Sequence, residues 1–282
     1  MQRNNNLSPL PWYRNIDEQN HFKSYTYGEV YPLYWPLGNV PAFQVIIPHG
    51  SVTVSDIQLV NCEDGRADEI MSDMTGLQIV RFSSYGYDII VYPSTAPMGL
   101  TIKEGRYYMY MLLSDGTEYY SDIFTLVGDT IGFLTIQWWD DSDLIMDGCR
   151  IVYSTGYRNT LWLPTQLGKP DYEFEEEGET RDGYFFPEMM ISEKKYKCVM
   201  LAPEYLCDVM RFIRLSDFVT VLDQNGVMYR CDTFLCTPKW QEQGDLASVE
   251  IEFTCDTVAK KVGRYIAELP SFNNDFNNDF DN

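Results

Sequence analysis

Alternation of apolar and polar residues, the pattern of a half-buried strand, recurs through the first half of the chain. It is clearest over residues 106–124, where two aromatic-rich runs flank Asp115-Gly116, a pair that favours the tight turn of a β-hairpin. Further apolar runs between residues 43 and 92 have the composition of strands. Strands at this spacing predict an immunoglobulin-like β-sandwich over residues 44–130.

A second β-rich module is predicted over residues 131–264. It contains Asn225-Gly226, another hairpin turn signal, and one helix near residues 203–215 that Pro203 can open in its first turn. Apolar residues at helical spacing give this helix one buried face. The expected strands of the module cover residues 133–139, 150–163, 219–222, 228–236 and 248–255.

Residues 1–43 lack the pattern of a compact domain and are predicted to form an extended arm rich in aromatic residues and proline. Prolines at five positions prevent a long helix and favour extended chain. The aromatic side chains between them need an apolar surface to cover, which is either the protein's own core or a neighbouring subunit. The candidate partner-binding residues are Trp12, Tyr13, Tyr25, Tyr27, Tyr31, Tyr34 and Trp35. We expect deletion of residues 1–40 to leave a folded chain that fails to assemble.

The C-terminal residues 265–282 end in a repeat of Phe-Asn-Asn-Asp with too little apolar surface to form a core. We expect an acidic, flexible tail there. The run Glu175-Glu176-Glu177 is predicted to be a solvated face, with contact to a basic partner as the alternative.

The chain is strongly acidic, with 42 Asp and Glu against 21 Lys and Arg and a formal net charge of −21. Such a surface repels phosphate backbones, so we expect no specific nucleic-acid binding, although an acidic channel would let DNA pass without sticking. The most apolar stretch, residues 123–139, is interrupted by Asp129 and two glycines, so no membrane insertion is expected. The seven cysteines include no CxxC pair, which favours free thiols in a reducing cytosol.

Residues typical of catalysis are sparse. The only histidines are His21 and His49, and neither lies in a catalytic motif. Phosphate-binding loops and the HExxH and GxSxG motifs do not occur. We therefore expect a protein that is not an enzyme, with no catalytic residue, no cofactor and no metal site.

Two other functions stay open at this point. The Asp140–Asp147 cluster follows two tryptophans, and a glycan hydrolase needs only two carboxylates about 5–10 Å apart. The same loop could bind calcium, although its spacing departs from that of an EF-hand. Alternatively, Trp138, Trp139 or Trp162 could stack on a sugar in a receptor- or glycan-binding module that contacts a host-surface glycan.

Three strings of residues give a more specific indication. Residues 11–33, 201–208 and 238–253 resemble uncharacterised structural proteins of tailed bacteriophages and prophages of Bacteroides-type gut bacteria, including the crAss-like group. The resemblance covers most of the chain. It implies a virion protein of the tail, baseplate or head–tail connector, made in the cytoplasm of the bacterial host, with copies of itself and other virion proteins as partners. It supplies no active-site residues.

Overall fold

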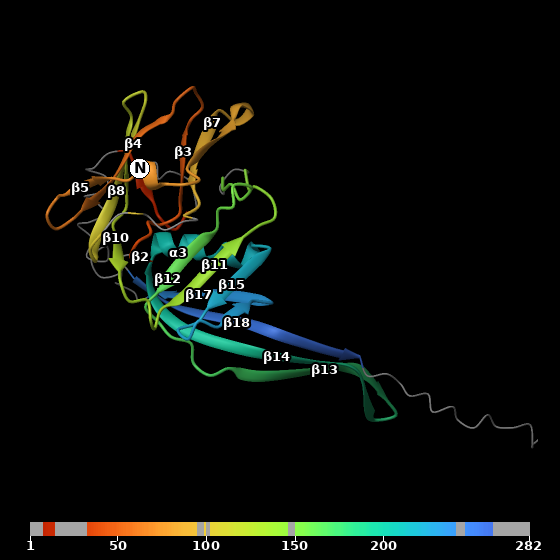
Figure 1. Ribbon diagram of the computed structural model, residues 1–282. Coiled ribbons are helices and arrows are strands. Elements are labelled where there is room, and N and C mark those ends of the chain that lie inside the picture. Colours follow the sequence, from red (N-terminus) through yellow and green to blue (C-terminus); the bar gives the residue numbers. More distant parts are fainter. Residues whose placement is uncertain are drawn as a thin grey trace, which may run out of the picture.

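The computed structural model describes residues 8–14, 33–94, 99, 102–145, 150–240 and 246–261. Within these residues the fold is mainly β, with one α-helix and three sheets (Figure 1). The predicted fold class, a β-rich protein of two modules with one helix, is confirmed. No helix among the described residues is long and apolar enough to cross a membrane.

The largest sheet runs through both halves of the described chain. Its strands, in spatial order, are β1 (Trp12–Tyr13), β9 (Glu118–Ser121), β8 (Gly105–Leu113), β10 (Phe124–Val127), β2 (Leu33–Pro36), β12 (Asn159–Leu163), β11 (Leu134–Trp139), β15 (Phe218–Leu222) and β16 (Met228–Arg230). In addition, β4 (Val54–Asn61) pairs with β8, and β5 (Ala67–Glu69) pairs with β4.

The N-terminal module is a sandwich of two sheets. A three-stranded sheet of β3 (Phe43–Pro48), β7 (Tyr87–Tyr92) and β6 (Gln78–Phe82) packs through its apolar side chains against β4 and β8 of the large sheet. Every residue of β7 is buried, whereas β8 alternates between buried and partly exposed positions, so β7 lies deepest in this module. The predicted hairpin turn at Asp115-Gly116 joins β8 to β9, with Gly116 at φ +84°.

Strand β2 connects the two modules, although its residues were predicted to belong to a separate arm. It runs parallel to β10 on one side and meets β12 on the other, where Tyr34 pairs with Trp162. The two modules therefore share one continuous sheet. Residues 151–157 also cross the predicted boundary near residue 130, because Ile151, Val152 and Tyr157 are buried in the N-terminal core.

The second module encloses its own core between the large sheet and a four-stranded sheet. That sheet has the order β13 (Asp171–Arg181), β14 (Tyr184–Pro203), β18 (Leu246–Lys261) and β17 (Thr233–Trp240). Helix α3 (Glu204–Met210) packs on it and is shorter than predicted, because a 3-10 turn, η3 (Ile213–Leu215), replaces its last turn. The apolar face of the helix is buried as expected. Two further 3-10 turns are η1 (Met71–Asp73) and η2 (Ser83–Tyr85).

The cysteines that the structure describes are all free thiols, in agreement with the sequence-based prediction. Burial raises the pKa of Cys198 and Cys236 to about 12 and that of Cys207 to about 11. These thiols are therefore protonated at neutral pH and pack as small apolar side chains. The predicted tail over residues 265–282 lies outside the described residues.

Candidate functional site

Three strands project from the body of the molecule as a long ribbon (Figure 1). β14 has 20 residues and β18 has 16, whereas a strand in a globular protein averages about five or six. We call the projecting residues 171–194 and 256–261 the β-arm. None of its described side chains is buried. The β-arm therefore gains little stability from packing on the body and presents both of its faces to solvent.

Local sequence explains why the β-arm forms a hairpin. Asp182 and Gly183 have φ values of +51° and +83°, the left-handed pair that a two-residue hairpin turn requires. The ladder between β13 and β14 shifts register at Gly178, where an added Cβ atom would overlap the carbonyl oxygen of Phe186. Only glycine fits at that point of the hairpin.

Exposed apolar side chains lie along one face of the β-arm, interspersed with Glu176, Ser192 and Lys194, which forms an ion pair with Asp256 at 2.8 Å. Phe174 pairs with Ser192, which in turn pairs with Val258, and cross-strand partners lie on the same face of a sheet. This face continues the buried side of β14, on which Tyr196 and Cys198 are covered by the second core. We call Tyr172, Phe174, Met190 and Val258 the arm stripe; these side chains are 61%, 75%, 38% and 62% exposed.

Three more aromatic side chains are exposed at the tip of the hairpin, namely Tyr184, Phe185 and Phe186. Contiguous exposed apolar residues are rare on monomeric soluble proteins and mark surfaces that contact another molecule. Such exposure is especially notable on a chain with a net charge of −21, because acidic residues are plentiful elsewhere on its surface.

The opposite face of the ribbon carries a cluster of ion pairs next to Met189 and Ile191. Lys195 lies 3.1 Å from Glu173 and 2.6 Å from Glu252, and Lys197 lies 3.2 Å from the second oxygen of Glu252. Burial raises the pKa of Glu252, but hydrogen bonds from both lysines outweigh it and hold that pKa below its usual range. Glu175 and Glu177 lie on this face, whereas Glu176 pairs with Met190 and lies on the face of the arm stripe. All three glutamates are exposed and form no ion pair with a described residue, as predicted for a solvated run.

The described residues that were predicted to bind a partner through an N-terminal arm pack instead against the protein's own core. Trp12 is 3% exposed, with its ring 4.7 Å from that of Phe43, and Tyr13 and Trp35 are each 8% exposed. Tyr34 is half-buried and contacts Phe133 edge to face at 5.3 Å. The protein's own core covers these aromatic rings, so assigning Trp12, Tyr13 and Trp35 to a partner surface was wrong. Tyr25, Tyr27 and Tyr31 lie outside the described residues.

The three tryptophans considered for glycan stacking have different environments. Trp138 is 1% exposed, so it offers no ring face to a ligand and is excluded from that role. The ring of Trp139 stacks on the ring of Phe218, with the two centroids 5.3 Å apart. The guanidinium of Arg158 also lies over the Trp139 ring, 4.1 Å from its centroid. Only Trp162 is half-exposed beside a cleft.

The acidic loop after β11 holds its own backbone in place. Asp140 is buried and accepts a hydrogen bond from the Asp217 amide at 2.8 Å, and burial raises its pKa. Asp143 accepts from the amides of Tyr153 and Ser154, both at 2.7 Å, while the Asp141 amide donates to Asp217. Asp147 lies outside the described residues. In the described part of the chain, no group of three or more His, Cys, Asp or Glu residues could hold a metal ion.

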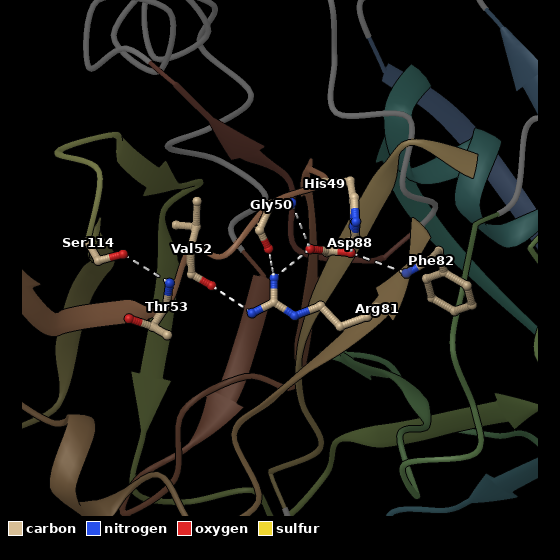
Figure 2. A network of polar contacts seen from close by, with 8 residues as sticks. All are labelled: His49, Gly50, Val52, Thr53, Arg81, Phe82, Asp88 and Ser114. Carbon is tan, nitrogen blue, oxygen red and sulfur yellow. Dashed lines mark hydrogen bonds and ion pairs between the residues drawn. The ribbon is translucent and has the colours of Figure 1, made fainter. Parts of the chain in front are cut away.

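Asp88 is the centre of a polar network that sequence reasoning missed (Figure 2). Its buried carboxylate lies 2.8 Å from Nδ1 of His49 and accepts from Arg81 at 2.7 Å, as well as from the amides of Phe82 and Gly50. Burial raises the pKa of Asp88, but these hydrogen bonds together outweigh it and leave that pKa lowered. Arg81 also donates to the carbonyls of Gly50 and Val52. The network clamps the β3–β4 turn to β6 and β7.

We expect Asp88→Ala to lower the free energy of unfolding by about 2–3 kcal/mol, because it leaves Arg81 and two amides without their acceptor. The folded-state pKa of Asp88 lies below that of the unfolded chain. Its carboxylate therefore stabilises the fold above about pH 4, and this contribution is lost as the pH falls through the lowered pKa. Urea unfolding of wild type and variant at pH 7 and pH 3 tests this. Asp68→Ala, which removes an exposed ion pair with Arg66, is the control and should cost about 0.5 kcal/mol or less.

No protein-family model matches the chain, and a comparison with curated proteins finds none that is similar. The fold and the site define a mainly β protein of two joined modules with an exposed, aromatic-lined β-arm.

Proposed function

We propose that this protein is a non-enzymatic structural subunit of a tailed-phage virion, in the tail, baseplate or head–tail connector, and that neighbouring copies bind through the β-arm. The observation that carries the proposal is the arm stripe, which continues the buried face of β14 beyond the body into solvent. The resemblance of residues 11–33, 201–208 and 238–253 to phage structural proteins supports the virion as the setting.

The β-arm has the features of an interlocking element. Its aromatic side chains provide a large contact area at a low cost in side-chain entropy, as in interface hot spots. It also has unpaired backbone, because β17 pairs with β18 only as far as Thr254 and β13 pairs with β14 alone among the described strands. A neighbouring strand can add to either edge. The glutamates of β13 keep the exposed edge soluble before assembly.

The projection of the β-arm is suited to a head-to-tail contact. An arm that leaves the body can bind a different surface on the next copy, and such heterologous contacts close into rings or extend into tubes. The two modules share one sheet, so they form a firm base from which the arm extends. A ring or tube of this kind is what a tail or connector protein builds.

Light scattering behind a sizing column tests the proposal on the purified chain. We expect a mass that is a whole multiple of 32.8 kDa and an oligomer that is favoured by raised salt, because each copy carries a formal charge of −21 and salt screens the repulsion. A mass of 32.8 kDa at every protein and salt concentration tested would contradict self-assembly through the β-arm.

A further inference from the structure

A cleft of about 440 Å³ lies where the two modules meet. One wall is the outer face of β11 and β12, with Gln137, Thr160 and Trp162, and the other comes from β2 and the residues after β7, with Trp35 and Ser94. Its volume is within the range of small-molecule sites, and such sites favour the junctions between modules. Sheet pairing joins β11, β12 and β2, and a hydrogen bond from the Ser94 hydroxyl to the carbonyl of Val40 holds the residues after β7, so the cleft is preformed.

Two polar side chains in the cleft, Gln137 and Thr160, make only long hydrogen bonds to described residues and can therefore bind a ligand. The amide of Gln137 makes one long contact, 3.4 Å to the hydroxyl of Thr160, and its carbonyl oxygen has no partner among the described residues. Besides accepting from Gln137, the Thr160 hydroxyl makes one other contact with a described residue: it donates to the backbone carbonyl of Arg158, also at 3.4 Å. An amide and a hydroxyl on one strand pair, beside the half-exposed ring of Trp162, match the hydroxyl groups and apolar face of a sugar ring.

Arg158 gives the cleft its charge. It is the one charged residue among the described side chains that line the cleft, in a protein with twice as many acidic as basic residues. Its guanidinium is exposed, forms no ion pair with a described residue and is held 4.1 Å from the ring of Trp139. A fixed guanidinium with free donors is suited to a carboxylate, which it can bind with two parallel hydrogen bonds.

Ser94 adds backbone strain at the rim of the cleft. It is a non-glycine residue with φ at +52°, and its hydroxyl donates to the carbonyl of Val40 at 2.7 Å, which holds it there. Residues in this sparsely populated conformation concentrate at ligand sites, where the surrounding structure maintains them.

We propose that this cleft binds an acidic saccharide, with Arg158 on the sugar carboxylate, Trp162 against the ring, and Gln137 and Thr160 on its hydroxyl groups. The inference does not depend on the β-arm, because no residue of the cleft belongs to it.

Matched sugars that differ by one carboxylate test the site. Saturation-transfer NMR would compare D-galacturonate with D-galactose, D-glucuronate with D-glucose, and sialyllactose with lactose. We expect at least one acidic sugar to bind about tenfold or more tightly than its neutral counterpart, and its affinity to fall as salt is raised. Arg158→Gln and Trp162→Ala should each weaken that binding about tenfold or more. Arg230→Gln, at an arginine that stacks on Phe218 outside the cleft, should leave binding unchanged.

Three results would overturn the proposal. The first is no binding of any acidic sugar by the folded wild type, and the second is equal binding of acidic and neutral members of each pair. The third is unchanged affinity in Arg158→Gln. Since Arg158 is exposed, that variant is expected to fold, and circular dichroism would confirm it.

Discussion

A chain that lacks residues 1–40 is expected to be unfolded and insoluble. The deletion removes β1 and β2, and with β2 it removes the strand that pairs with β10 on one side and β12 on the other. It also removes Leu10, Trp12 and Val40, which are 1%, 3% and 0% exposed. Losing side chains of this kind costs about 2–5 kcal/mol each, so these three alone cost about as much as the whole net stability of an ordinary domain, about 5–15 kcal/mol, and the lost strand pairing adds to that. This replaces the expectation, drawn from the sequence, of a folded chain that fails to assemble.

A single substitution tests the same point with less disruption. Trp12→Ala is expected to lower the free energy of unfolding by about 3–5 kcal/mol, because it leaves a cavity beside Phe43. Trp240→Ala is the matched control: that side chain is 47% exposed, so its removal should cost about 1 kcal/mol or less. Urea unfolding followed by circular dichroism gives both values. A soluble 41–282 chain with a cooperative transition at the wild-type midpoint would show that the N-terminal strands are dispensable.

The second large effect is expected at the arm stripe. Tyr172→Glu combined with Phe174→Glu should convert the oligomer to a 32.8 kDa monomer without changing the unfolding midpoint. Both side chains are exposed in the single chain, so the substitutions leave its core intact. In an assembly each aromatic ring would be buried, and losing a hot-spot aromatic costs about 2–4 kcal/mol of binding free energy. Two such losses weaken each contact about a thousandfold or more.

A control variant must separate the effect of two added negative charges from the effect of placing them on the arm stripe. Tyr85→Glu combined with Leu215→Glu adds the same two negative charges at side chains that are 58% and 73% exposed but lie outside the β-arm. This control should assemble like the wild type in the sizing experiment. If both double variants assemble normally, the arm stripe is not the contact; if both are monomeric, added repulsion rather than lost aromatic contact explains the change.

Local signals in the sequence were sufficient for the elements that depend on neighbouring residues. The Asp115-Gly116 and Asn225-Gly226 turns, the helix that follows Pro203, and most strands of the sandwich are where the pattern placed them. Each depends on backbone preferences within a few residues: a positive φ at glycine, the fixed φ of proline, or side-chain alternation.

Features that depend on distant pairing could not be predicted in this way. The parallel partner of β2 is β10, much later in the chain, and nothing in Leu33–Pro36 indicates that partner. The Asp88 network likewise joins a turn to two later strands. For the β-arm a local signal did exist. Tyr172 and Phe174 alternate with glutamates at the period of a strand, but because the run is so rich in charge it was predicted only as a solvated surface and not as a strand.

Photo-cross-linking from the arm stripe tests subunit contact most directly. With p-benzoylphenylalanine in place of Phe174, irradiation of the assembled protein should give a covalent dimer, and peptide mass spectrometry should locate the bond on the body of a neighbouring copy. The same label in place of Tyr85, which is 58% exposed and outside the β-arm, should give none. Absence of a cross-link from position 174 in a sample shown to be oligomeric, or equal yields from the two positions, would contradict assembly through the β-arm.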